Sequence, residues 1–308
     1  MYKKIALIVI IVLFIVGLFV VIKREKEKFL PGNYNGLKVT ASFYPLYFFA
    51  SQIGGNKAYV YNITPSGGEP HDYEPSAQDM ETIETSKLLI INGGGLEAWG
   101  EDMKKNLDPK KTIIVTAGEG LTDQMVNENG IDKVDPHVWL SPPLAKKMVD
   151  NITKGFVEAD PMNAQYYTDN ASALKEKLVA LDNSYKTGLV SCAQKNIVTS
   201  HAAFGYLATA YHLNQVSIAG LSPDAEPSPK QLIDIAAFIK KNNIKYIFFE
   251  SLVSPKLSDT LAGETGAKTM VLDPIEGLSK DELAAGETYL TEMENNLINL
   301  KIALQCKQ

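Results

Sequence analysis

MNAQYYTDNASALKEKLVALDNSYKTGLV, residues 162–190, is a long stretch without a proline in its interior. Its Leu174, Leu178 and Leu181 recur at the spacing of one helix face. We therefore expect one long helix over residues 161–190. Strand and helix patterns lie on both sides of it, so we interpret it as a rigid link between two lobes. An ordinary helix within a single domain is the alternative.

The segment before this helix alternates between strand-like and helix-like patterns. Short runs rich in β-branched and aromatic residues are followed by glycine, proline or serine, and then by amphipathic stretches. A loop of about twenty residues is expected before the sequence DPHVWLSP at 135–142. Strands are expected at 37–43, 58–65, 87–95 and 111–118.

The segment after the long helix repeats the alternation. Strands are expected from residue 196 and at 214–220, 245–251 and 268–274. Strands that alternate with helices favour a parallel sheet. The predicted fold class is therefore α/β, with two lobes that each hold a roughly four-stranded parallel sheet flanked by helices. The predicted lobes are residues 37–160 and 191–308, joined by the linker helix at 161–190.

Residues 1–36 differ in character from the rest of the chain. Ile5 to Ile22 are eighteen uncharged, mostly aliphatic residues, which as a helix would span about 27 Å, close to the thickness of a bilayer core. The exit KREKEK contains neither an A-x-A cleavage pattern nor a cysteine for a lipid. We interpret this segment as an uncleaved transmembrane anchor followed by a tether, with a cleaved signal peptide as the alternative. Basic residues on both sides leave its orientation open.

The charge of the chain excludes one class of partner. The net charge is −6, and residues 31–308 hold 24 basic against 34 acidic side chains once the six basic and two acidic residues of the first thirty are subtracted. Phosphate backbones require a clustered basic surface. No nucleic-acid partner is expected.

Three of the four histidines occupy similar places in this pattern. His71 follows the second expected strand, His137 lies in a loop just before a helix, and His201 lies where a strand gives way to a helix. Ligands of open parallel sheets bind outside the carboxyl ends of the strands. We therefore expect a shared metal site that the fold assembles, rather than three unrelated surface histidines. His212, near a helix end, is interpreted as a surface residue.

A closed metal site needs a fourth ligand, and a carboxylate would reduce the charge of a divalent cation. Asp273 ends the last expected strand and is the predicted ligand. Glu250 ends the preceding strand, and we expect it to orient a ligand histidine rather than bind the metal. Glu69, Asp72 and Asp135 are interpreted as solvated or loop-shaping acids.

The two cysteines, Cys192 and Cys306, lie far apart in the sequence. In a chain with an export-type segment they are consistent with one disulfide, and equally with two isolated thiols.

Seven motifs occur in the order found in a known family. The chain resembles the zinc/manganese solute-binding proteins of ABC uptake transporters over residues 37–308, essentially the whole body after the tether. The motifs are GGEPHDYEPS, INGGGLEAW, DPHVWLSP, VTSHAAFGYLA, AGLSPDAEPSP, IFFES and VLDP.

The resemblance implies a monomeric carrier that binds its metal between two lobes and passes it to a membrane permease. It implies His71 and His137 as ligands from the first lobe, and His201 and Asp273 from the second. It also favours a disulfide and a body that faces outward. Three imidazoles suit Zn²⁺ better than Mn²⁺, and manganese-type members tend to carry glutamate at the position of His201. Zinc is therefore predicted, and a site that accepts manganese is the alternative.

Two features depart from the family pattern. Many zinc-specific members have a histidine-rich loop before the second ligand, but residues 118–136 contain no histidine. The family's usual lipid anchor or cleavage site is also missing, so the N-terminal helix itself would be the tether. Two other functions stay open at this stage. One is a zinc hydrolase with Glu250 as general base, and the other is an adhesin-like surface protein whose metal is structural.

Overall fold

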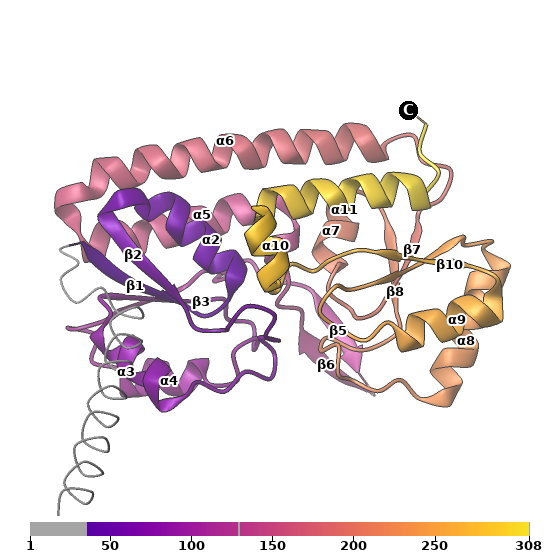
Figure 1. Ribbon diagram of the computed structural model, residues 1–308, viewed down its shortest axis with the longest axis horizontal. Helices are drawn as coiled ribbons and strands as arrows, with labels where there is room; N and C mark the ends of the chain where they lie inside the picture. The colour runs from indigo at the N-terminus through magenta and orange to yellow at the C-terminus, as the bar shows by residue number, and fades with distance from the viewer. Residues whose placement is uncertain (1–35, 129, 308) are drawn as a thin grey trace, which may run out of the picture. The chain divides into compact units, whose positions relative to one another are not determined.

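The computed structural model describes residues 36–128 and 130–307, and it confirms the α/β fold class with two lobes (Figure 1). The predicted membrane span at Ile5–Ile22 lies outside the described residues. Within the described part of the chain, no helix is both long and apolar enough to cross a bilayer.

The first lobe is built on a parallel sheet with strand order β2-β1-β3-β4. β3 is apolar throughout because both faces of the sheet are covered. Its Leu88 and Ile90 belong to the main core with α2 and α5, whereas Leu89 and Ile91 pack with side chains of α3 and α4 on the other face. The elements are β1 (Leu37–Ala41), α2 (Tyr44–Gly54), β2 (Ala58–Asn62), α3 (Ala77–Thr85), β3 (Leu88–Ile91), α4 (Gly100–Asn106), β4 (Ile113–Thr116) and α5 (Pro142–Ala159).

The second lobe repeats this plan with the strand order β10-β9-β7-β8, again parallel. Val198 and Ile247 of the sheet pack against α8 and α9, while Ile197 and Phe248 face the main core. The elements are β7 (Asn196–Thr199), α7 (Gly205–Ala210), β8 (Asn214–Ser217), α8 (Pro229–Lys241), β9 (Tyr246–Phe249), α9 (Lys256–Thr265), β10 (Lys268–Val271), α10 (Lys280–Ala285) and α11 (Tyr289–Ala303).

The expected long helix is present as α6 (Ala164–Leu189). At 1.5 Å per residue its 26 residues span about 39 Å. Its buried side chains include the predicted Leu174, Leu178 and Leu181, and they form one face. That face packs against α2 and α5 of the first lobe and α11 of the second, so α6 runs along both lobes (Figure 1).

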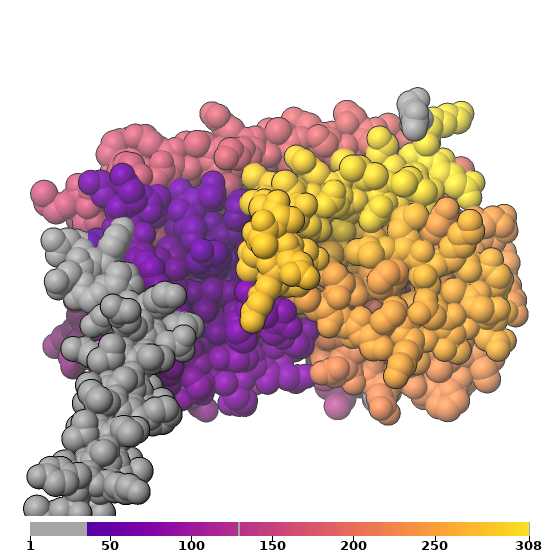
Figure 2. Space-filling model, viewed as in Figure 1, coloured from indigo at the N-terminus to yellow at the C-terminus, as the bar shows by residue number. Residues whose placement is uncertain are grey.

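The apolar core continues from one lobe into the other. The Trp139 indole N–H donates to the Pro274 carbonyl at 2.7 Å, and the Tyr289 hydroxyl donates to the Trp139 carbonyl at 2.5 Å. The Tyr289 ring packs edge-on against Phe49 of α2, with ring centroids 4.8 Å apart. The start of α11 is thus seated on the first lobe, and Figure 2 shows the yellow surface of α10 and α11 against the purple surface of α2. These contacts hold the lobes together beside α6.

The loop expected before DPHVWLSP contains structure that the sequence analysis did not predict. β5 (Met125–Glu128) and β6 (Ile131–Val134) form a two-stranded antiparallel hairpin, with Glu128 opposite Ile131. The strands are short and largely exposed, so they carry no hydrophobic period. The dipeptide Asn129-Gly130 is nevertheless a strong hairpin-turn signal.

The two cysteines form a disulfide between Cys192 and Cys306. It joins the segment after α6 to the segment after α11, which also meet in an antiparallel bridge. The disulfide that the family resemblance favoured is confirmed, and the alternative of two free thiols is wrong.

Candidate metal centre

His71 comes from the loop between β2 and α3. Its backbone N–H donates to the Glu69 carboxylate at 3.0 Å, and the loop ends at the Ser76 capping box that starts α3. Glu69 therefore shapes this loop, as expected. Burial and the nearby charge of Glu276 raise the pKa of Glu69 to about 9.

His137 follows β6 and precedes a short 3-10 turn, Val138–Leu140. The Asp135 Oδ1 atom accepts the His137 backbone N–H at 2.9 Å and lies 2.8 Å from its ring Nδ1. Asn92, at the exit of β3, donates to the Pro136 carbonyl at 2.9 Å and fixes the same loop. Asp135 thus shapes the loop through the backbone N–H. It also orients the His137 ring so that Nε2 points away from the Asp135 carboxylate, and this contact with the ring was not predicted from the sequence.

His201 follows β7, and its carbonyl accepts the Thr199 hydroxyl at 2.8 Å. The Glu250 carboxylate, at the end of β9, lies 2.5 Å from His201 Nδ1 and also accepts the Ser200 hydroxyl. Glu250 is therefore placed where we expected an orienting residue, on the far side of the ring from Nε2.

The fourth carboxylate beside the histidines belongs to Glu276, and the expected Asp273 does not join them. Asp273 accepts the Ser251 hydroxyl with one oxygen and the Ile275 backbone N–H at 2.6 Å with the other. Ile275 has a φ of 58°, which is rare for a β-branched residue. Asp273 thus stabilises a turn that brings Glu276 to the cluster, three residues beyond the position predicted from the strand end.

The four side chains offer one ligand atom each around a common centre. His71, His137, His201 and Glu276 place these atoms within 4.8 Å of one another. The Nε2 atom of His137 lies 3.2 Å from that of His71 and 3.3 Å from that of His201, and all three Nε2 atoms lie 3.2–3.4 Å from Glu276 Oε1. Metal–nitrogen bonds of about 2.0–2.1 Å at tetrahedral angles give ligand separations of about 3.3–3.4 Å. Five of the six separations therefore match a tetrahedrally bound Zn²⁺, and the sixth, between His71 and His201, is within 4.8 Å.

Burial and charge at the centre favour a bound cation. Burial alone would lower the pKa of His201, but the charges of Glu250 and Glu276 outweigh it and raise that pKa well above its usual value. The pKa of His137 is raised in the same way, by Asp135 and Glu276. The pKa of Glu276 is held well below its usual value despite burial, chiefly by the charge of His201. The acidic groups around the histidines thus favour positive charge at this centre.

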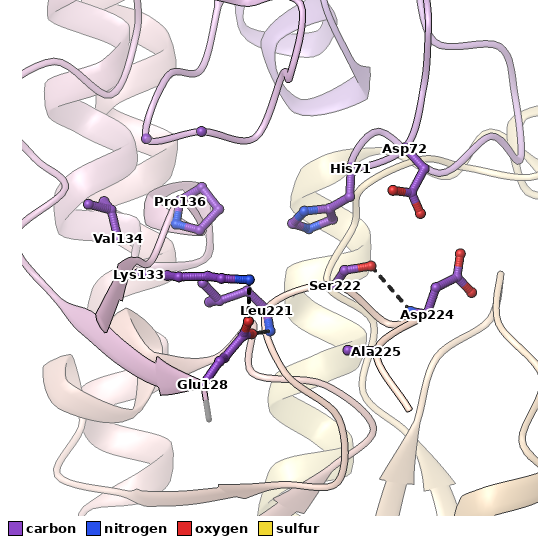
Figure 3. Close-up of a pocket in the computed structure, with 12 residues that line it drawn as sticks. His71, Asp72, Glu128, Lys133, Val134, Pro136, Leu221, Ser222, Asp224 and Ala225 are labelled. Atoms are coloured by element: carbon purple, nitrogen blue, oxygen red, sulfur yellow. Dashed lines mark hydrogen bonds and ion pairs between the residues drawn. The ribbon is translucent and has the colours of Figure 1, made fainter. Parts of the chain in front are cut away.

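A cavity of about 730 Å³ reaches the cluster from one side. His71 lines it, and His71 is the most exposed of the four ligand side chains, at 9% against 0–2% for the others. The wall carries three carboxylates and one ammonium group, from Asp72, Glu128, Asp224 and Lys133 (Figure 3). A cation therefore meets an acidic vestibule before it meets His71.

His212 takes no part in this cluster. It is exposed at the end of α7, with a φ of 56°.

Two parallel-sheet lobes with three imidazoles and a carboxylate gathered between them define a metal-binding protein of the solute-binding class. Its family follows from comparison with known proteins. The family model described as ZnuA, zinc-uptake complex component A, periplasmic, matches residues 39–303, and the chain belongs to this family.

Individual relatives agree with this assignment. The chain is 41% identical, over 88% of each chain, to the high-affinity zinc uptake system protein ZnuA of Bacillus subtilis. It is 40% identical to the zinc-binding protein AdcA of Streptococcus pyogenes, over 86% of this chain but only 56% of that longer protein. The Zn(II)-bound ZnuA-like domain of Streptococcus pneumoniae AdcA is similar in structure, with a TM-score of 0.76, 41% identity, and coverage of 88% and 99% of the two chains.

Proposed function

We propose that this protein captures Zn²⁺ between its lobes and delivers it to an ABC permease for uptake. The observation that carries the proposal is the closed set of four donors, His71, His137, His201 and Glu276, two from each lobe. Asp135 and Glu250 each accept an Nδ1–H, which leaves the Nε2 lone pairs of His137 and His201 directed at the metal.

The donor set supports zinc over manganese. Three nitrogen ligands and a single carboxylate suit Zn²⁺, whereas Mn²⁺ prefers oxygen. Ligand separations near 3.3 Å agree with a tetrahedral zinc site. A site that also accepts Mn²⁺ is the alternative.

A carrier is favoured over a zinc hydrolase by the same contacts. A catalytic zinc site keeps a position open for water and needs a general base beside it. Here four protein donors surround one centre, and the carboxylate of Glu250 is engaged with Ser200 and His201 Nδ1.

We further propose that the chain is organised as an anchor and tether at 1–36, lobes at 37–160 and 191–308, and a linker helix at 161–190, and that it acts as a monomer. The apolar stretch Ile5–Ile22 would hold the protein in the cell membrane with its body facing outward. Fractionation and mass spectrometry of the mature protein test the anchor, because cleavage would remove the stretch and release the body.

Elemental analysis of the full chain purified without added metal tests the function. Zinc at one ion per chain is expected, followed by retention of zinc against excess manganese in competition. In cells, deletion of the gene should impair growth at low zinc, and added zinc should restore growth. A protein that binds no zinc would refute the proposal. A protein that unfolds when zinc is chelated would favour the structural-metal alternative.

A further inference from the structure

The β5–β6 hairpin of the first lobe is bound to the second lobe at its base. The Gln124 backbone N–H donates to the Tyr206 hydroxyl at 3.1 Å, and the Gln124 side-chain amide donates to Thr209 Oγ1 at 3.0 Å. The Tyr206 hydroxyl in turn donates to the Asp135 carbonyl at 3.1 Å. These contacts tie the hairpin base to α7.

A further contact lies at the other end of β5. The Leu221 backbone N–H, in the loop after β8, donates to Glu128 Oε1 at 2.5 Å. Glu128 Oε2 pairs with Lys133 Nζ on β6, also at 2.5 Å (Figure 3). Burial opposes ionisation of Glu128, but the hydrogen bonds from Lys133 and Leu221 outweigh it and lower the pKa. The contact with Leu221 is therefore a charge-assisted hydrogen bond between lobes.

The residue before Leu221 is a glycine, and the close approach requires it. A methyl group at Gly220 would overlap the Glu128 carboxylate. Only a residue without a side chain lets the carboxylate reach the Leu221 amide.

The Glu128–Leu221 contact forms part of the wall of the cavity that leads to His71. Glu128, Lys133, Leu221 and His71 all line this cavity. The contacts between the lobes around Trp139 and Tyr289 are, by contrast, buried in the core. Opening the Glu128 contact would therefore widen the approach to the metal without separating the core.

We propose that the β5–β6 hairpin is an interlobe clasp, and that the hydrogen bond from Leu221 to Glu128 sets the rate at which zinc enters and leaves. The inference rests on the proposed function and deepens it. Glu128 acts through the wall of the cavity and is not one of the four donors, so it should control exchange rates more than equilibrium affinity.

Glu128→Ala in the full chain is the direct test, with zinc release followed by stopped-flow mixing with a chelator. We expect release about tenfold faster, which corresponds to about 1.4 kcal/mol and is below the usual contribution of a hydrogen bond to a charged group. Association should quicken by a similar factor, so the dissociation constant should change less than threefold. Glu119→Ala removes the same charge from an exposed position of the first lobe and should leave both rates unchanged.

Gly220→Ala tests the same contact from the second lobe and should also speed release. Amide hydrogen exchange of the metal-free protein provides a readout that needs no zinc. Glu128→Ala and Gly220→Ala should each speed exchange at Leu221, whereas Glu119→Ala should not.

Release rates in Glu128→Ala equal to those of the wild type would overturn the proposal, whether or not the Leu221 amide exchanges faster. Zinc release that is accelerated as much in Glu119→Ala as in Glu128→Ala would also overturn it, because the effect would then come from the loss of a negative charge in general. A wild-type protein that binds no zinc would instead refute the proposed function. Amide exchange in the metal-free protein tests only the Glu128–Leu221 contact, so the two failures can be told apart.

Discussion

Replacing Glu276 by glutamine tests which carboxylate completes the metal centre. The change keeps the shape and one oxygen of the side chain but removes its negative charge. A unit charge and a divalent cation about 2 Å apart attract by about 17 kcal/mol at an effective dielectric constant of about 20, and dehydration of both groups offsets most of this. Removing one partner of a buried charged pair costs about 3–5 kcal/mol. Zinc affinity should therefore fall by about 10² to 10⁴.

Asp273→Asn is the matched control, because it removes one charge from the same turn. Asparagine can still accept the Ile275 backbone N–H through its side-chain oxygen, so we expect zinc affinity to fall less than tenfold. Competition against a chelator of known affinity measures both variants, and far-UV circular dichroism shows whether each is folded. A large loss in Asp273→Asn together with near-normal affinity in Glu276→Gln would refute this account and favour the ligand set expected from the sequence.

Four further outcomes are expected. His201→Ala should lower zinc affinity by several orders of magnitude in calorimetry while the far-UV spectrum stays near native, and unchanged binding would contradict the site; His212→Ala should have no effect. Glu250→Gln should weaken zinc binding by about 10- to 100-fold, because the amide no longer fixes the His201 ring as a carboxylate does. The pKa values of the buried His137 and His201 are raised above the usual 6.5, and protons on these rings compete with zinc. As the pH is lowered from neutral, zinc affinity should therefore begin to fall before the pH reaches 6.5, and zinc titration at several pH values measures this. Replacing Cys192 and Cys306 by serine should lower the free energy of unfolding by about 2–5 kcal/mol, the range for removal of a native disulfide, while zinc affinity, measured in the same samples, stays unchanged.

The lobes and the long helix could be predicted because their signals are local. Each of the eight strands of the parallel sheets falls within a stretch that the sequence pattern predicts, and Leu174, Leu178 and Leu181 fall on the buried face of α6. The hairpin could not be predicted from hydrophobic period, because its strands of four residues bury little. Its signal was the Asn129-Gly130 dipeptide alone.

The three histidines of the centre could be placed from topology, because they follow strands or precede helices at one edge of each lobe. Glu276 could not be placed in this way. The strand-end rule points first to Asp273, and only the left-handed backbone of Ile275 carries the chain on to Glu276. A turn of this kind has no sequence signature when the residue is isoleucine. Asp135 was recognised as loop-shaping. Its contact with the His137 ring depends on the local backbone turn between the two residues, which leaves no mark in the hydrophobic pattern of the sequence.

The core that passes from Phe49 through Tyr289 and Trp139 has a consequence for how a transporter would recognise its cargo. Separating the lobes would expose these aromatic rings to water. The overall shape of the protein should therefore be nearly the same with and without zinc. What changes on loading is the charge beside the vestibule, where a divalent ion binds among the imidazoles. A permease that accepts only the zinc-bound form must therefore distinguish the two forms by the electrostatic potential and the loop positions near the vestibule, rather than by a difference in overall shape.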